Sequence, residues 1–231
     1  MKKIIKKHSL AVRWMHWINF PLLTIMIWSG ILIYWANDVY KLSWANKTLL
    51  KFFPDSIYKA LNIPFRLAEG MNLHFYFMWF FTINGVVYFF YLLFSKEYKL
   101  IFPNKPCLKE AWRVILHDLH IRKGLPPQQK YNAAQRLAYT GIIFLGFAVV
   151  ITGLAVYKPA QLYWLCNMLG GYEWARIEHF TITILFILFF IVHIVQVAIA
   201  GWRNFSSIIT GFEVVKENQS SSIKEEVENE K

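Results

Sequence analysis

Four long apolar runs constrain this 231-residue chain more than any other feature of its sequence. The hydrocarbon core of a bilayer is crossed by a helix of about 20 apolar residues. The runs have that length, and we expect helices over residues 10–36, 66–94, 134–157 and 173–202. The sequence therefore predicts an all-α membrane protein built as a bundle of four transmembrane helices.

The basic residues indicate how these spans are oriented. Of 25 Lys and Arg residues, five precede Trp17, nine lie between Phe94 and Leu137, and four follow Ala200, while the other two loops share seven. Positive side chains accumulate in cytoplasmic loops. We therefore expect both termini and the 95–136 loop on the cytoplasmic side. This topology accounts for the net charge of +11, so we expect no nucleic-acid partner.

The remaining segments are predicted to form smaller elements. Residues 49–65 carry charges and residues 159–171 are too short to cross, so both are predicted to be interfacial, with short helices in the loops. The basic N-terminus is followed by a full-length apolar run without a small-residue cleavage site, and we expect it to remain as the first span. We predict one membrane domain over residues 1–213 and a disordered, acidic cytoplasmic tail over residues 214–231.

The two cysteines limit the cofactors that the chain could hold by itself. Cys107 and Cys166 fall on opposite sides of the membrane in the predicted topology, so they have no disulfide available between them. Two cysteines are also too few for a cysteine-ligated iron–sulfur cluster. The sequence has no glycine-rich dinucleotide fingerprint either.

Four of the seven histidines lie within the predicted spans. His16 is on the first helix, His74 on the second, and His179 and His193 on the fourth. An ionisable side chain inside a membrane helix is costly and usually functional. Fourteen residues separate His179 from His193, about four turns less 40°, so the two lie near one face and about 21 Å apart.

Depth in the membrane divides these histidines into two pairs. Ser9 suits an N-cap and would begin the first helix near residue 10, which puts His16 about two turns inside its cytoplasmic end. His193 lies near that same side. His74 and His179 both lie near the outer ends of their helices.

Two pairs at two depths, each joining different helices, are what two b-type haems with bis-imidazole ligation would need. We expect His16 with His193, and His74 with His179, as axial ligands of the haem irons. Gly30 follows His16 by fourteen residues, on the same face, where a missing side chain would let a macrocycle approach. The alternatives are hydrogen-bonded core histidines, polar contacts between helices, or a path for protons or metal ions.

Three segments of the chain resemble a known family. They are HSLAVRWMHWINFPLLTIMIWSGILI, KYNAAQRLAYTGIIFLGFAVVITGL and RIEHFTITILFILFFIVHIVQVAIAGW. They are similar to the bacterial di-haem cytochrome b membrane subunits of the cytochrome b561, nickel-hydrogenase and formate dehydrogenase gamma type, and most of all to thiosulfate-reductase-type subunits. The resemblance covers about residues 8–213. It implies the bacterial inner membrane, two haem b groups and the same two histidine pairs.

The resemblance also implies a quinone site. The family exchanges electrons between menaquinone or ubiquinone and a partner protein, often a molybdopterin or nickel–iron enzyme. Its quinone site lies beside the cytoplasmic-side haem, where the third helix begins; here the candidates are Tyr131, Asn132 and Gln135. Asn132 could donate a hydrogen bond to a ring oxygen. The alternative is that Asn132 and Gln135 form a capping box without any ligand.

Five further residues are candidates for smaller roles. Arg13, Arg66 and Arg176 lie near the membrane faces and could pair with haem propionates, because a guanidinium matches a carboxylate at two points. The alternative is that they extend to lipid headgroups. His117 and His120 could share a helix face and bind a metal, but a solvated interfacial helix is the stronger interpretation.

We therefore expect a di-haem b subunit that moves electrons between the quinone pool and a partner oxidoreductase of the molybdopterin or iron–sulfur type. The chain has no large soluble domain, so a subunit is favoured over a complete enzyme. Two alternatives stay open. One is a stand-alone cytochrome that oxidises quinol and reduces a small acceptor such as superoxide, and the other is a haem-free carrier of protons or metal ions.

Overall fold

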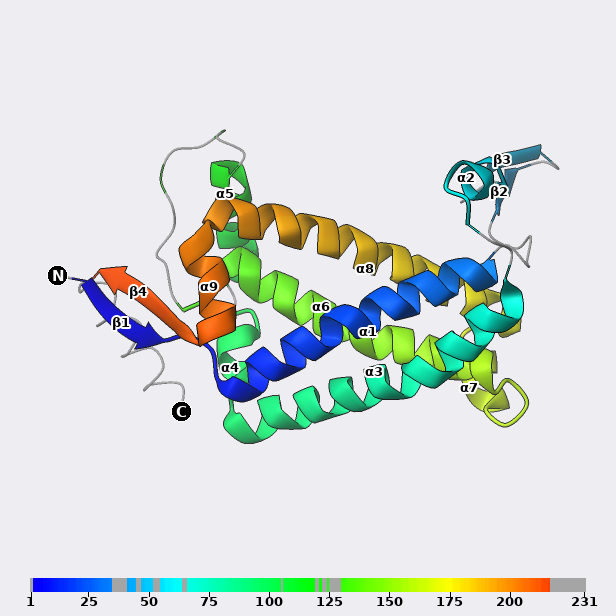
Figure 1. Cartoon of the computed structure of the whole chain (residues 1–231), viewed down its shortest axis with the longest axis horizontal. Helices are drawn as coiled ribbons and strands as arrows, with labels where there is room; N and C mark the ends of the chain where they lie inside the picture. The colour runs from blue at the N-terminus through cyan, green and yellow to red at the C-terminus, as the bar shows by residue number, and fades with distance from the viewer. Residues whose placement is uncertain are drawn as a thin grey trace. The chain divides into compact units, whose positions relative to one another are not determined.

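The computed structural model describes residues 2–34, 41–44, 47–51, 55–63, 66–104, 106–118, 121, 124 and 130–216. Its elements, labelled in Figure 1, are β1 (Lys2–Lys6), α1 (Leu10–Tyr34), β2 (Lys41–Trp44), β3 (Lys47–Lys51), α2 (Asp55–Ala60), α3 (Leu67–Ser95), α4 (Tyr98–Ile101), α5 (Cys107–Asp118), α6 (Ala133–Tyr157), α7 (Tyr163–Met168), α8 (Tyr172–Ala200), α9 (Trp202–Thr210) and β4 (Phe212–Lys216).

Four helices of the described chain are long and apolar enough to cross a membrane, namely α1, α3, α6 and α8. They confirm the predicted all-α membrane fold with four spans. Large apolar side chains are exposed along them, including Phe94 at 83% and Val192 at 59%. In lipid such exposure costs nothing, because the surrounding solvent is as apolar as the side chains.

The start of α1 follows from one side chain. The backbone N–H of Val12 donates to Ser9 Oγ at 3.3 Å, and the helix begins at Leu10. This hydrogen bond satisfies one of the backbone donors that a helix leaves open in its first turn. The predicted N-cap at Ser9 is confirmed.

The chain divides into two compact units. The first consists of Met1–Met15, Val87–Phe147 and Leu185–Lys231, and the second of His16–Val86 and Ala148–Ile184. Each of the four long helices has one part in the first unit and the other part in the second.

The first unit contains a pair of strands that the sequence did not predict. Strand β1 pairs antiparallel with β4, with Ile4 opposite Val214 and Lys6 opposite Phe212. The domain boundary predicted at residue 213 therefore falls inside β4. The rest of the predicted tail, residues 217–231, lies outside the described residues.

Helix α5 of the first unit is amphipathic. It buries Cys107 and Val114, and it exposes Trp112 and Ile115, as an interfacial helix should. The Cys107 thiol donates to the carbonyl of Ala133 at 3.3 Å, at the start of α6. Burial raises the pKa of this thiol, so it stays protonated and can act as the donor.

The second unit holds the segments predicted to be interfacial. Strands β2 and β3 pair antiparallel, and α2 follows them. Tyr58 of α2 is buried and donates to the carbonyl of Ile31 in α1 at 2.7 Å. Burial, and secondarily the charge of Asp55, raises the pKa of Tyr58 to about 12. The phenol is therefore neutral and anchors α2 to the end of α1.

Helix α7, also in the second unit, is too short to cross a membrane. Its Leu165 and Cys166 are buried against Ala155 of α6 and Ala175 of α8. The two alanines are fully buried, so α7 packs closely over the ends of both helices. The interfacial segment predicted between the third and fourth spans thus has a helical core.

Helices α1 and α3 come into close contact at Gly70. A Cβ atom at this position would lie 2.7 Å from Leu32 Cβ and 3.1 Å from the carbonyl oxygen of Ser29. Real Cβ atoms do not come so near to another helix, so the contact requires glycine. Small residues commonly permit such contacts between membrane helices.

We predict that Gly70→Ala destabilises the bundle by about 1–3 kcal/mol, because the added methyl group overpacks the contact between α1 and α3. The measurement is thermal unfolding of the detergent-solubilised protein, followed by circular dichroism. Gly85→Ala is the matched control in the same helix, since its Cβ would meet nothing within 4 Å. This control should be neutral or stabilising by up to about 1 kcal/mol. Equal midpoints for the two variants would contradict the packing argument.

Candidate functional site

Two of the predicted ligand histidines face each other in the second unit. The imidazole centroids of His74 on α3 and His179 on α8 lie 6.2 Å apart, with an interplanar angle of 78°. They come from helices that are more than a hundred positions apart in sequence. The structure thus brings together the pair that was predicted from depth in the membrane.

A serine hydroxyl holds the ring of His74. Ser29 Oγ lies 2.9 Å from His74 Nδ1 and 3.0 Å from the carbonyl oxygen of Met26. A hydroxyl has one proton to donate. Because the carbonyl can only accept, that proton goes to Met26, and the hydroxyl oxygen accepts the Nδ1–H of His74. His74 Nε2 is then left with its lone pair.

A threonine does the same for His179. Thr152 Oγ1 lies 3.0 Å from His179 Nδ1, and it donates to the carbonyl oxygens of Ala148 at 2.8 Å and Val149 at 3.2 Å. The hydroxyl oxygen therefore accepts the Nδ1–H of His179. Both facing imidazoles thus have the same tautomer, with Nε2 as the available donor atom.

Glycines lie against both imidazoles. A Cβ atom at Gly153 would be 3.1 Å from His179 Cε1, and one at Gly30 would be 3.9 Å from His74 Cε1. The first distance is tighter than ordinary contact, so a side chain at position 153 would press on the ring. Gly30 was predicted to lie beside a haem site, whereas Gly153 was not predicted.

The geometry of this pair fits a haem iron. Two metal–imidazole bonds of about 2 Å, with about 1 Å more from each nitrogen to its ring centroid, come to roughly 6 Å, close to the observed 6.2 Å. Haem iron takes one axial ligand on either side, and two neutral imidazoles supply both. Within the described ranges no group of three or more His, Cys, Asp or Glu side chains could hold a metal ion.

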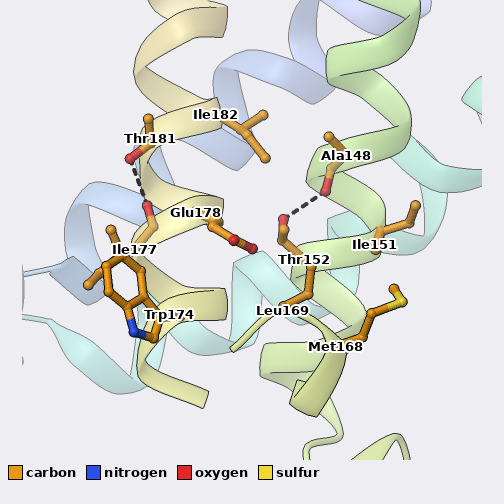
Figure 2. A pocket seen from close by; sticks show the side chains of 10 residues that line it. All are labelled: Ala148, Ile151, Thr152, Met168, Leu169, Trp174, Ile177, Glu178, Thr181 and Ile182. Carbon is orange, nitrogen blue, oxygen red and sulfur yellow. Dashed lines mark hydrogen bonds between the residues drawn. The ribbon is translucent and has the colours of Figure 1, made fainter. Parts of the chain in front are cut away.

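An open groove of about 600 Å³ runs along α6 and α8 beside this pair. Figure 2 shows Thr152 on one wall and Glu178 reaching in from the other, among mostly apolar side chains that include Trp174 and Met168. Thr152 thus lines the groove with the hydroxyl that holds His179.

His16 and His193 belong to different compact units. His16 is exposed, and its ring is edge-on to Trp17 at 5.3 Å. His193 is half-buried, and its ring stacks on Phe189 at 6.0 Å with an interplanar angle of 9°. The pairing of these two histidines stays a prediction.

The candidate quinone residues have structural roles at the start of α6. The N–H of Asn132 donates to Gln135 Oε1 at 3.0 Å, and the N–H of Gln135 donates to Asn132 Oδ1 at 2.8 Å. This reciprocal pair is a capping box, and it begins the helix at Ala133. Tyr131 is buried edge-on to Tyr139 at 5.2 Å, and burial raises the pKa of Tyr131.

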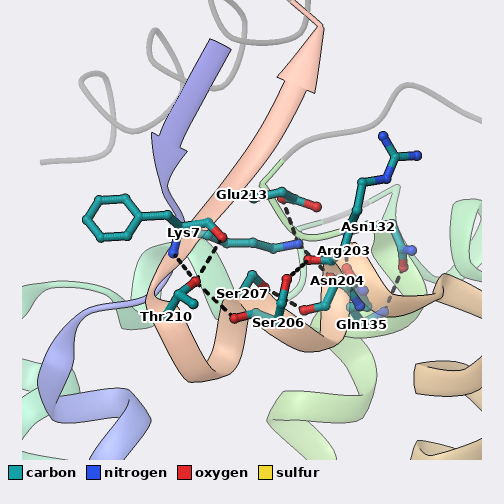
Figure 3. A network of polar contacts seen from close by, with 10 residues as sticks. Lys7, Asn132, Gln135, Arg203, Asn204, Ser206, Ser207, Thr210 and Glu213 are labelled. Atoms are coloured by element: carbon teal, nitrogen blue, oxygen red, sulfur yellow. Dashed lines mark hydrogen bonds and ion pairs between the residues drawn. The ribbon is translucent and has the colours of Figure 1, made fainter. Parts of the chain in front are cut away.

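A polar network lies close to this capping box (Figure 3). Lys7 Nζ donates to Asn204 Oδ1 at 2.8 Å and forms an ion pair with Glu213 at 2.9 Å. The side chains of Lys7 and Glu213 are only 14% and 22% exposed. These contacts therefore join the residue after β1 to α9 and β4.

Arg13 is the predicted propionate partner that the structure leaves partly unsatisfied. Its guanidinium donates to the carbonyl of Ile209. Its Nε atom is buried and has no hydrogen-bond partner among the residues that the structure describes. This N–H therefore remains as a donor for an acceptor such as a carboxylate.

The other two arginines pair with carboxylates one turn away. Arg66 forms an ion pair with Glu69 at an exposed site. Arg176 lies 3.6 Å from Glu173, and its own side chain is 13% exposed. These local pairs neither support nor exclude a propionate contact, so the roles predicted for both arginines stay predictions.

Of the two histidines considered for a metal, His117 lies at the end of α5. His117 Nδ1 is 3.5 Å from Asp118 Oδ1, and His120 lies outside the described residues. The metal site considered for this pair therefore stays a prediction.

The residues that sequence reasoning missed are Ser29, Thr152 and Gly153. A signal for them is present in the sequence, because a hydroxyl residue is followed directly by glycine in WSGIL and in ITGLA. The pattern occurs at Ser29–Gly30 on α1 and at Thr152–Gly153 on α6, the two long helices that carry neither of the facing histidines. It also occurs at Thr140–Gly141 on α6 and at Thr210–Gly211, so the pattern alone does not single out the residues beside the histidines.

Comparison with known proteins agrees with this architecture. The sequence profile of the family described as prokaryotic cytochrome b561 matches residues 7–211. A protein of Azospira oryzae, named putative protein-methionine-sulfoxide reductase subunit YedZ1, is 31% identical over 211 residues, which cover 91% of this chain and 98% of that protein. The profile match spans all four long helices and both facing histidines. The chain therefore belongs to the prokaryotic cytochrome b561 family and is a haem-binding membrane electron-transfer protein.

Proposed function

We propose that the chain is the di-haem b membrane subunit of an oxidoreductase and carries electrons between the quinone pool and a redox partner. The observation that carries the proposal is the facing pair His74 and His179, with both Nε2 atoms available. The Azospira relative is named as a putative reductase subunit, which favours a subunit over a stand-alone enzyme. The family favours haem over a haem-free carrier.

We assign His74 and His179 to one haem, and His16 and His193 to the other. Each haem, when bound, supplies a one-electron redox couple. The chain contributes the neutral imidazoles, the hydroxyls that orient two of them, and glycines that leave room beside the rings. We assign the buried Nε atom of Arg13 to a haem propionate, because it still lacks an acceptor.

We further propose that the partner reduces methionine sulfoxide, because the Azospira relative is named as a putative protein-methionine-sulfoxide reductase subunit. Oxidation of a quinol to a quinone releases two electrons and two protons. Reduction of a sulfoxide to a thioether consumes two electrons and two protons and releases water, so the two half-reactions balance. The partner would be a molybdopterin or iron–sulfur protein, as the family resemblance implies.

The quinone site is proposed at the start of α6, where only part of Asn132 is available. Its Oδ1 atom accepts a hydrogen bond within the capping box. Its Nδ2 group donates in none of the hydrogen bonds found among the described residues, and it can bond a quinone oxygen. Gln135 likewise uses its side-chain oxygen in the cap, so its Nε2 group is a second candidate donor beside that of Asn132.

We predict that the four histidines act as two pairs. Replacing any one by alanine should remove one redox component and spare most of the other, because a buried haem with one axial ligand is held loosely. His74→Ala and His179→Ala should remove the same component, and His16→Ala and His193→Ala the other. Haem content and potentiometric titration of the reduced absorption bands measure this.

His8→Ala is the control for this series, since His8 precedes the first span. It should retain both components. Loss of the same component in His16→Ala and in His74→Ala would refute the pairing, as would loss of a haem in His8→Ala while His16→Ala keeps both.

Variants at Asn132 separate a quinone role from helix capping. Asn132→Asp and Asn132→Ser keep a capping oxygen, whereas Asn132→Ala removes it at a cost of about 1 kcal/mol. If the amide Nδ2 binds quinone, all three variants should slow quinol-driven haem reduction, and only Asn132→Ala should also lower the unfolding midpoint. Wild-type reduction rates in Asn132→Asp and Asn132→Ser would eliminate the quinone assignment.

The role as a subunit predicts how the haems are reoxidised. Methionine sulfoxide should oxidise the dithionite-reduced haems in the complex gently extracted from native membranes, but not in the isolated chain. Stopped-flow absorption of the reduced bands measures both rates. Reoxidation of the isolated chain by sulfoxide, or an equal loss of reduced haem to superoxide in both preparations, would favour the stand-alone enzyme.

A further inference from the structure

In the second unit, a hydroxyl residue followed by a glycine lies against each of the two facing histidines. We call the residues Ser29–Gly30 on α1 and Thr152–Gly153 on α6 the hydroxyl–glycine pairs. Each pair lies against one of the two facing histidines, with the hydroxyl on Nδ1 and the glycine beside Cε1. Helices α1 and α6 supply neither imidazole of this site, yet each holds one in place.

Both hydroxyls are buried, so no bulk water competes for the imidazole proton. Ser29 is 0% and Thr152 is 3% exposed. Leaving a buried N–H without an acceptor costs free energy. Each hydroxyl also gives its own proton to a carbonyl of its own helix, so its oxygen faces the histidine as an acceptor only.

We propose that Ser29 and Thr152 are positioning residues that fix the tautomer of His74 and His179 and lower the redox potential of the haem held between them. The inference rests on the proposed function, which supplies that haem. A hydrogen bond from the distal N–H makes an imidazole a stronger ligand. A ligand that donates electron density more strongly stabilises ferric haem more than ferrous haem, so the midpoint potential of the haem falls.

The glycines of the two pairs contribute unequally. A Cβ at Gly153 would press on His179 at 3.1 Å, whereas one at Gly30 would make ordinary contact with His74 at 3.9 Å. The ring of His179 is therefore confined between the Thr152 hydroxyl and the backbone at Gly153. Its orientation is set more tightly than that of His74.

The test compares two groups of variants. The first group removes a hydroxyl that contacts a histidine, and the control group removes a hydroxyl that bonds only a backbone carbonyl. Thr152→Val, Thr152→Ala and Ser29→Ala delete the acceptors, and Thr152→Ser keeps one. Thr181→Val is the control in the same groove, because its hydroxyl bonds the carbonyl of Ile177 at 2.8 Å. Thr24→Ala is the control on α1, because its hydroxyl bonds the carbonyl of Phe20 at 2.9 Å.

The readouts are the midpoint potential of each haem and the low-spin EPR signal of the ferric protein. Loss of an outer hydrogen-bond partner changes metal affinity by about 10- to 100-fold. If the affinity of the histidine ligands falls tenfold for ferric haem and stays the same for ferrous haem, the midpoint potential rises by about 59 mV for this one-electron couple. We expect this upward shift in a single component, the one removed by His74→Ala and His179→Ala. Thr152→Ser and both controls should keep the wild-type values.

A purely structural role for the hydroxyls would change haem content or thermal stability without moving the potential. Unchanged potentials and EPR signals in Thr152→Val, Thr152→Ala and Ser29→Ala would overturn the inference, as would an equal shift in Thr181→Val. If His74→Ala and His179→Ala both kept two haem components, the proposed ligand set itself would fail. The failure of the inference and that of the proposed function are therefore distinguishable.

Discussion

A neutral imidazole inside an apolar helix has two ring nitrogens with opposite needs, and the second unit is organised around them. The N–H must find an acceptor, because an unsatisfied donor in hydrocarbon costs free energy. The structure meets this need with hydroxyls at 2.9 and 3.0 Å from the Nδ1 atoms of His74 and His179. The other nitrogen of each ring is then free for a ligand, so satisfying a folding requirement also prepares the chemistry.

These hydrogen bonds can form only if neighbouring helices come close, and glycine makes this possible. Apolar surface gives little net attraction between helices in lipid, where association depends on packing and polar contacts. The approach at Gly70 brings Leu32 of α1 against α3, next to the turn that carries Ser29. At Gly153 the backbone of α6 lies against the ring of His179. Packing and ligand placement in this unit therefore depend on the same few positions.

The sequence predicts best what is decided locally. The four spans follow from the length of apolar runs, and the caps at Ser9 and Asn132 follow from residues within one turn of chain. The pairing of β1 with β4 joins Lys2–Lys6 to Phe212–Lys216, segments far apart in sequence, and no local pattern marks it. The Ser29 bond to His74 depends on how two helices are rotated, and a serine in an apolar helix usually bonds only its own backbone. Hydroxyl followed by glycine also occurs at Thr140–Gly141 and Thr210–Gly211, so this pattern alone could not have indicated it.

The start of α6 shows the opposite balance between folding and function. The side-chain oxygens of Asn132 and Gln135 cap the helix. Arg136 is buried and donates to the carbonyls of Phe102 at 3.1 Å and Lys99 at 3.3 Å, which joins α6 to α4 and the residue after it. Folding thus uses most of the polar atoms in the segment that resembles a quinone site. What remains are the side-chain NH2 groups of Asn132 and Gln135, so hydrogen bonding to a quinone from this segment would depend on these two donors, and shape and apolar contact would have to supply the rest of the affinity.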